Sequence, residues 1–487
     1  VEAGNGKVEV RYVRTDNDER RRLADNANCP KRPLQAVNFR DQQATFQEVY
    51  RCITFSYLRS TERIEFVNPG IEGMEYQITS IIKKMINPER SIGFLTGHDE
   101  ATPDTAMPYL SRILQDNHLG YTTRTVDLHG GEDSIPTDIK GLVIVNPTRR
   151  IEERELRRIN EYLMRGGSVA VFASGVNVTG TDTRPSAARA EHNLDTLLRG
   201  YGVTLKNNVI LDPRATDAIE EIEQGRVRIR MFAFPAITHD GSNKSTERTF
   251  QGLNQAHSSV FRLPGIVMPF VSQLEVDSGR YCVAESDTDA AERRRCEGQN
   301  KPMLVTVART SDASITQQDN FELDALDLIM RRQTVFGRGG AHGPYTVGLA
   351  IAGPLRSAFP DGGSAGGDAG AQGGSNVPAQ ATSERPARLL VMGSGKMFSI
   401  EQLRAIAIGG IPTNVEMLLN TFDWLSQDYD LLAVRAKDVS EPELGEVSDN
   451  KKRLFQWGSI LGLPLLVGLA GLLLSNLRAK SRRELKV

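Results

Sequence analysis

A short polar run, Gly97-His98-Asp99-Glu100, follows an apolar segment that is typical of a buried strand. A histidine can act as a base near neutral pH, and neighbouring carboxylates can bind a metal or share a proton. No second histidine stands at the spacing of a metal-binding motif, so the sequence predicts no metal site and no cofactor. The alternative is an ordinary turn whose carboxylates cap the next helix. The candidate ligand-binding residues are Thr96, Gly97, His98, Asp99 and Glu100.

A second candidate for chemistry is Gly393-Ser394-Gly395-Lys396, which also follows an apolar strand. A nucleophile elbow requires glycines two positions on either side of the serine, and Met392 and Lys396 stand there instead. The phosphate-loop pattern is missing as well, because Met397 follows the lysine. We therefore expect a plain turn, predict no catalytic residue, and expect no enzyme activity. Without an ATP-binding motif, the chain cannot power transport by itself.

The four cysteines fall into two pairs that are local in sequence: Cys29 with Cys52, and Cys282 with Cys296. Neither pair has the C-x-x-C spacing of a zinc or redox centre. Two disulfides closing small loops and four buried free thiols both fit this pattern. Disulfides persist mainly outside the cytosol, so an extracytoplasmic body would favour the first reading.

The chain has 487 residues and a formal net charge of −2. This length suggests more than one domain, and the near balance of charges gives no basic surface for nucleic acid. Because the sequence begins at Val1, a signal peptide or an N-terminal helix could precede it.

Apolar strands and amphipathic helices alternate from residue 91 onward. This alternation is typical of a parallel sheet covered on both faces, so we predict a doubly wound α/β domain over residues 91–215. Its expected strands are 92–95, 122–128, 141–145 and 168–173, and its expected helices are 107–119 and 152–164.

The remaining soluble segments are predicted from weaker patterns. Residues 1–90 form a small α/β module with an opening strand at 8–13, a helix near 16–26, a hairpin at 46–58 and 62–67, and a helix at 75–85. Residues 216–360 are β-richer, with candidate strands at 226–232, 272–276, 303–309 and 346–351. A Gly-rich linker or loop at 361–385 precedes a C-terminal α/β segment, 386–437, with strands at 388–392 and 431–435 and a helix at 414–426.

The strongest signal is an uncharged stretch at 454–477, which follows a stalk at 438–453. As a helix it would span roughly 36 Å, which is enough for a hydrocarbon core of about 30 Å. We predict a transmembrane helix, and its small residues would let another helix approach closely: Gly458, Gly462, Gly468 and Gly471. The basic tail, 478–487, predicts a cytoplasmic end and an extracytoplasmic body.

Several segments resemble one known family. The run at 75–84 followed by 92–98, then 390–394, 414–425 and 432–435, is similar to the gliding-motility-type (GldG-like) auxiliary proteins of ABC transporters. The resemblance covers most of the chain. It departs from the family pattern in the cysteine-containing insert 282–296, the Gly-rich loop, and the absence of an N-terminal helix.

This resemblance implies a bacterial inner-membrane accessory subunit whose body lies in the periplasm. It would work with an ABC-2-type permease and a separate cytoplasmic ATPase, in contact with membrane lipid, and a homodimer within that complex is one arrangement. Its central fold would be flavodoxin-like or glutamine-amidotransferase-like without the catalytic machinery. Two alternatives stay open: a periplasmic protein that binds a glycan or envelope polymer, and a hydrolase or amidase of the same fold.

Overall fold

The structure is a computed structural model, and the chain divides into two compact units, Val1–Ala436 and Lys437–Val487. It describes residues 9–426 together with 471–472, apart from 28, 39–42, 59, 65–77, 80, 83–84, 87–89, 116–119, 182, 223–224, 240–251, 262, 338–341, 360–381 and 399–412. Five predicted features therefore lie wholly or mostly outside the described residues: the Gly-rich linker, the strand at 431–435, the stalk, the transmembrane helix and the tail. Of the four membrane glycines, only Gly471 is described, and it is helical. No helix in the described part of the chain is long and apolar enough to cross a bilayer.

The N-terminal segment forms one helix and two hairpins: α1 (Asp18–Asn26), β1 (Lys31–Asn38), β2 (Gln43–Tyr50), β3 (Ile53–Tyr57) and β4 (Ser60–Ile64). The helix starts where predicted, because the Asn17 side chain accepts a hydrogen bond from the backbone N–H of Arg20. A disulfide joins Cys29 to Cys52. The predicted opening strand is wrong: residues 9–13 have no regular structure, since no described strand pairs with them and supplies hydrogen-bond partners. The described residues of the predicted 75–85 helix are helical.

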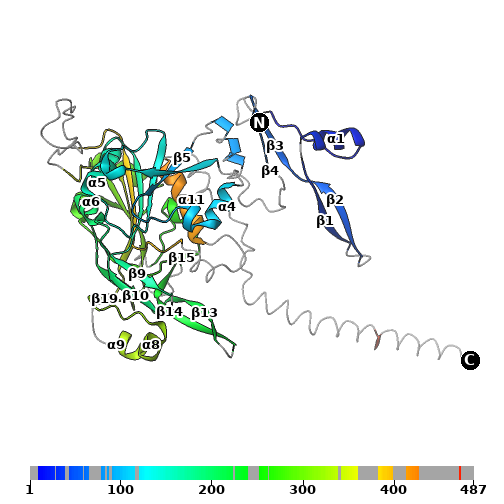
Figure 1. Cartoon of the computed structure of the whole chain (residues 1–487). Helices are drawn as coiled ribbons and strands as arrows, with labels where there is room; N and C mark the ends of the chain where they lie inside the picture. Colours follow the sequence, from blue (N-terminus) through cyan, green and yellow to red (C-terminus); the bar gives the residue numbers. More distant parts are fainter. Residues whose placement is uncertain are drawn as a thin grey trace, which may run out of the picture. The chain divides into compact units, whose positions relative to one another are not determined.

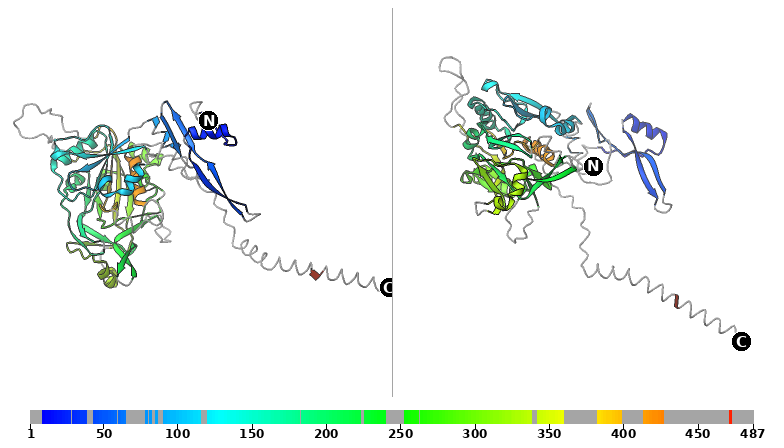
Figure 2. Two further views of the ribbon diagram at one scale, coloured as in Figure 1. Left: turned by 45° about the vertical axis from the view of Figure 1, so that its right-hand side comes forward. Right: turned by 60° about the horizontal axis from the view of Figure 1, so that its bottom comes forward.

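The largest sheet of the first unit has eight strands, and Figures 1 and 2 show it with helices packed against it. In spatial order its strands are β17 (Cys282–Ala284), β18 (Met303–Arg309), β20 (Thr346–Gly353), β21 (Ala387–Met392), β8 (Ser168–Phe172), β7 (Ile139–Val145), β5 (Arg90–Thr96) and β6 (Tyr121–Asp127). All four strands predicted within 91–215 belong to it. So do three that were predicted further along, at 303–309, 346–351 and 388–392.

The sheet is mixed, which corrects the expectation of a purely parallel one. Strands β6, β5, β7, β8 and β21 are parallel, whereas β20 runs antiparallel to both of its neighbours. Numbered along the chain, the five parallel strands have the order 2-1-3-4-5, which is the flavodoxin-like order. The last of these strands comes from beyond the long β-richer segment, so the sheet extends across the predicted boundary at 215.

Helices cover both faces of the sheet, as the continuous apolar strands require. Alternate strand residues point to opposite faces. Phe94 and Phe172 pack in one core cluster with α4 (Pro108–Gln115) and α11 (Thr413–Leu425). Leu95 and Val171 pack in the other with α5 (Glu153–Met164) and α6 (Leu194–Gly200). Figure 1 shows these helix pairs on the two sides of the sheet.

A further β-rich part packs around its own apolar cluster. Its strands pair as β9 with β10, β12 with β19, and β14 with both β13 and β15, whereas the paired strands β11 and β16 pack in the cluster of α5 and α6. They are β9 (Val176–Gly180), β10 (Pro185–Arg189), β11 (Val203–Leu205), β12 (Asn208–Leu211), β13 (Ala215–Ile222), β14 (Gly225–Thr238), β15 (Gly265–Val267), β16 (Leu274–Val276) and β19 (Ile315–Gln318). Two of them, β14 and β16, were predicted.

Short helices complete the unit. They are α3 (Pro103–Ala106), α7 (Ala290–Gly298), α8 (Ala325–Met330), α9 (Arg332–Gly337), and the 3₁₀ turns η2 (His129–Gly131), η3 (Ser258–Val260) and η4 (Ser278–Arg280). The second predicted cysteine pair is also a disulfide. Cys282 of β17 is bonded to Cys296 of α7, with their Cα atoms 5.4 Å apart.

Candidate functional site

The predicted ligand loop lies where the parallel strand order reverses, between β5 and β7. In open α/β sheets, ligands bind in the crevice outside the carboxyl ends of the strands at such a point. The chain turns sharply there: Gly97 has a φ of 120° and Asp99 a φ of 60°. Three backbone bonds tie the segments after β5 and β7 together. Ala101 N–H donates to the Val145 carbonyl (2.9 Å), and the N–H groups of Thr148 (3.0 Å) and Arg149 (3.2 Å) donate to the His98 carbonyl.

His98 is buried and is held between two carboxylates. Its Nδ1 lies 3.0 Å from Glu100 Oε1, and its Nε2 lies 2.8 Å from Glu155 Oε2. The hydrogen bond to Glu100 raises the pKa of His98, and the negative charges of Glu100 and Glu155 act in the same direction, whereas burial opposes them. This shift moves the imidazole toward the doubly protonated form, in which each ring N–H can donate to one carboxylate.

Glu155 connects this histidine to two further elements. One of its oxygens accepts from the backbone N–H of Glu152 at the start of α5 (3.0 Å), and the other accepts from Gly130 of η2 (3.2 Å). The Glu155 carboxylate thus caps the N-terminus of α5, where negative charge is favourable, and it also pairs with His98. The sequence motif alone indicated His98 and Glu100, but Glu155 lies far along the chain and was recognised only as part of a helix.

The other residues of the predicted loop have simpler surroundings. Asp99 is exposed, and Arg149 Nε lies 3.0 Å from its Oδ2. Arg149 also donates to the Gly97 carbonyl (2.6 Å). Thr96 is partly buried, and Gly97 is exposed. A ligand reaching this loop would meet Gly97, Asp99 and Arg149, while His98 and Glu100 face inward.

Ser394, the other candidate from the sequence, is fully buried after β21. Its Oγ donates to the Pro269 carbonyl (2.5 Å). The neighbouring Gly395 donates its N–H to Ser174 Oγ (3.1 Å), and a Cβ at Gly395 would lie 2.5 Å from Asn146 Oδ1. The turn after β21 is thus packed against the turns after β7 and β8. This agrees with the expectation of a plain turn.

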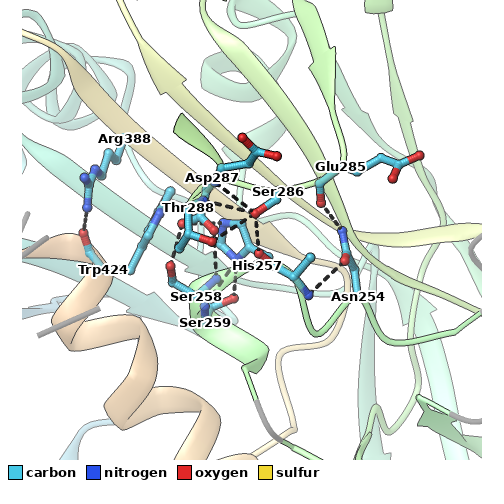
Figure 3. A network of polar contacts seen from close by, with 12 residues as sticks. Asn254, His257, Ser258, Ser259, Glu285, Ser286, Asp287, Thr288, Arg388 and Trp424 are labelled. Atoms are coloured by element: carbon cyan, nitrogen blue, oxygen red, sulfur yellow. Dashed lines mark hydrogen bonds and ion pairs between the residues drawn. The ribbon is translucent and has the colours of Figure 1, made fainter. Parts of the chain in front are cut away.

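A buried polar network around His257 was missed by the sequence reasoning (Figure 3). Ser258 donates to Asp287 twice, from its N–H to Oδ1 (3.0 Å) and from its Oγ to Oδ2 (2.7 Å). Asn254 donates to the carbonyls of Glu285 (2.8 Å) and Thr306 (3.0 Å). The bonds to Asp287 join η3 to the loop inside the Cys282–Cys296 insert, and Asn254 connects that loop to β18. No sequence signal links the two segments, because their contacts depend on how the chain folds back.

His257, Ser259 and Asp287 have the composition of a hydrolase triad but not its geometry. In a triad the serine contacts Nε2 and the aspartate contacts Nδ1. Here Ser259 contacts Nδ1, through its N–H (3.2 Å) and its Oγ (2.8 Å), and Asp287 Oδ2 lies 3.8 Å from Nε2. The His257 side chain has no exposed surface. Burial lowers its pKa, although the nearby charge of Asp287 opposes this. The network is thus suited to holding η3 in place beneath Trp424, whose ring centroid lies 5.2 Å from that of His257.

Among the described residues, no group of three or more His, Cys, Asp or Glu side chains is arranged to hold a metal ion. All four cysteines are committed to the two disulfides.

Comparisons with known proteins identify a family. The model of a family described as "ABC-type uncharacterized transport system" matches residues 89–420. No curated protein matches the chain. Among solved structures, the mmIFT52 N-terminal domain is similar with 15% sequence identity and a TM-score of 0.34, covering 69% of this chain and 96% of that one. A TM-score this low does not establish a shared fold.

Proposed function

The chain belongs to this family of ABC-type transport auxiliary proteins, and on that premise we propose that it is a non-enzymatic accessory subunit anchored in a bacterial inner membrane. Its body would lie in the periplasm, and it would dock on an ABC-2-type permease that a separate cytoplasmic ATPase drives. Gliding motility is one process in which such a subunit would work. The observation that carries the proposal is the family match at 89–420, which begins just before β5 and ends within α11.

Two features support the proposed location. The disulfides Cys29–Cys52 and Cys282–Cys296 suit an oxidising compartment, since such bonds are rare in the cytosol. The uncharged stretch at 454–477, followed by a basic tail, suits a helix that crosses the membrane with its end in the cytoplasm. The small residues along that stretch would let a permease helix approach closely.

The side chains that could carry chemistry support a non-enzymatic role. His98 is bonded at both ring nitrogens to carboxylates of the same body. Ser394 donates to a backbone carbonyl in the core, and a nucleophile needs an adjacent base and access to substrate instead. His257 lies in a closed network. Each of these three side chains is hydrogen-bonded or buried in a way that stabilises the fold. None of these observations favours the ligand-binding or hydrolase alternative.

Affinity purification in mild detergent tests the proposal. The full chain, tagged at its tail and expressed from its own locus, should co-purify with one multi-span permease and one ATPase. A matched chain that stops after Ala436, the end of the first compact unit, should lose both. Purification of the full chain without any transport subunit would contradict the proposal, and retention of both subunits by the shortened chain would show that docking does not use the C-terminal unit.

A further inference from the structure

Strand β6 is the edge strand of the eight-stranded sheet, at the end formed by the five parallel strands. It pairs with β5 through all seven residues, and no described strand pairs with its other side. In an edge strand, every second residue directs its N–H and C=O away from the sheet. The strand is rich in threonine, which suits β structure, and Thr122 and Thr125 are exposed.

A pocket lies between this strand and the segment that leads into β7. Its volume is about 280 Å³, and its walls are four consecutive residues of β6 and four from the segment that leads into β7: Arg124, Thr125, Val126, Asp127, Asp133, Ser134, Pro136 and Ile139. Since consecutive strand residues point to opposite faces, a pocket lined by all four reaches the strand's backbone edge. Val126, Pro136 and Ile139 make part of the wall apolar.

The polar wall of the pocket is acidic. Arg124 is paired with Asp138, so its charge is matched. Asp127 and Asp133 are exposed. Within the described structure, both form an ion pair with His129 alone, whose Nδ1 lies 3.8 Å from Asp127 Oδ1 and 2.7 Å from Asp133 Oδ2. The two carboxylates therefore leave this wall negative in either charge state of the histidine.

We propose that β6 and its pocket bind an extended segment of a partner protein, which adds a strand to the sheet and brings a basic side chain to the carboxylates of Asp127 and Asp133, beside His129. Backbone pairing would supply affinity, and the pocket would supply specificity, as in other cases of strand addition. A long basic side chain fits because its apolar stem can lie against Val126 and Pro136 while its charge reaches the carboxylates. This interaction goes beyond the proposed function, since it depends on neither the anchor nor the transport subunits.

A second copy of the chain fits this edge less well. If two β6 strands paired antiparallel around a two-fold axis over all seven residues, Arg124 would stand directly opposite the same residue of the other copy. Like charges in directly opposed positions destabilise a sheet. The acidic pocket would also receive no basic side chain other than that arginine, which is already paired with Asp138.

Synthetic peptides test the proposal with the full chain. The probe is an eight-residue peptide of alternating threonine and valine with one central lysine, and two matched peptides carry a central glutamate or N-methyl groups on every amide. The lysine peptide should slow hydrogen exchange at the amides of residues 121–127. By calorimetry the glutamate peptide should bind about fivefold more weakly or worse, and the N-methylated peptide should not bind.

Variants locate the charge effect. Asp127→Asn and Asp133→Asn should reduce the difference between the lysine and glutamate peptides, whereas Asp104→Asn, an exposed aspartate on α3, should leave it unchanged. Circular dichroism of each variant checks that it is folded. Unchanged exchange at 121–127, equal affinity for the two charged peptides, or binding of the N-methylated peptide would overturn the proposal. Slowed exchange at 121–127 on raising the chain's own concentration, with a dimer in sedimentation, would overturn it in favour of a second copy.

Discussion

His98 couples its own charge to the stability of the loop after β5, which it joins to α5 through Glu155. Its pKa is raised in the folded state, so it binds its proton more tightly there than in the unfolded chain, where the ordinary value is 6.5. The stabilising contribution is therefore complete below about pH 6.5 and is lost as pH rises through the higher folded value. We expect the urea midpoint of the wild-type chain to fall over this range relative to that of His98→Gln, which cannot carry the charge.

The matched control for this titration is His239→Gln, since His239 is exposed. Its urea midpoint should follow the wild type at every pH, because substitution of an exposed side chain usually changes stability little. A constant difference between wild type and His98→Gln from pH 5.5 to 8.5 would show that His98 does not change its charge in the way the geometry predicts. His98→Ala should destabilise more strongly, by about 3–5 kcal/mol, because it leaves two buried carboxylates without their partner.

A variant of Ser394 distinguishes a structural role of this hydroxyl from a catalytic one. Its hydroxyl donates to the Pro269 carbonyl in the core, so Ser394→Ala should lower the free energy of unfolding by about 1–3 kcal/mol. Exposed Ser278→Ala is the control and should change it little. Urea denaturation measures both. If Ser394 were a nucleophile, its alanine variant would lose cellular function completely while keeping its stability, and that result would contradict the proposed non-enzymatic role.

The sequence revealed only part of these residue environments. His98 and Glu100 are two positions apart, so their motif was visible. The alternative of a turn whose carboxylates cap the next helix is right about the turn and wrong about the cap, because Thr102 caps α3 while Glu100 bonds to His98. Glu155 and Asp287 were not recognised, because each meets its histidine through the fold: Glu155 is 57 positions from His98. A single sequence contains no distance information across such separations.

Elements built from neighbouring residues were predicted well. The strands β5, β6, β7 and β8 and the helices α1, α5 and α11 have strong local apolar patterns, and each was found within a few residues of its expected place. Partners and direction were not predictable in the same way. The antiparallel direction of β20 depends on its pairing with β18 and β21, and a period-two pattern is the same for either direction. Short strands such as β11 and β17 have too few residues to show a pattern.

The Cys282–Cys296 insert should behave as one element. Its disulfide closes a loop with a sequence separation of 14, so replacing both cysteines with serine should destabilise it by about 3 kcal/mol. Hydrogen exchange should rise in β17 and α7. It should also rise in η3, because Asp287 inside the loop accepts both hydrogen bonds from Ser258.

The N-terminal disulfide supplies the matched control. Replacing Cys29 and Cys52 with serine should raise exchange in the hairpins near that bond and leave α7 unchanged. If the Cys282 and Cys296 replacement raised exchange in α7 alone, the coupling from the insert to η3 would be wrong. If it raised exchange nowhere, the bond would contribute nothing to this element.

At the scale of the whole molecule, one sheet contains strands from three segments predicted from the sequence, 91–215, 216–360 and 386–437, the last of which was expected to pack back on the soluble body. The fifth parallel strand, β21, returns beside β8 after the chain has built the β-rich part, and α11 then covers the face that β5 to β8 expose. The Tyr121 hydroxyl on β6 donates to Asp423 of α11, which joins the far edge of the sheet to the last described helix of this unit. Shortening the chain before β21 would therefore expose the core of the flavodoxin-like half.

The proposed membrane anchor sets the last prediction, which concerns where the whole chain resides. Arginines at Leu465 and Leu466, near the middle of 454–477, should each oppose insertion by about 2.5–3.5 kcal/mol, whereas isoleucines at both positions should be tolerated. After carbonate extraction, we expect the wild type and the isoleucine pair in the membrane pellet and the arginine pair in the soluble fraction. In spheroplasts, external protease should digest the body and spare an epitope placed after Arg478. A wild-type chain that fractionates without membrane, or a body that protease reaches only after lysis, would contradict the anchored periplasmic arrangement, and the uncharged stretch would then have to be covered by protein instead of lipid.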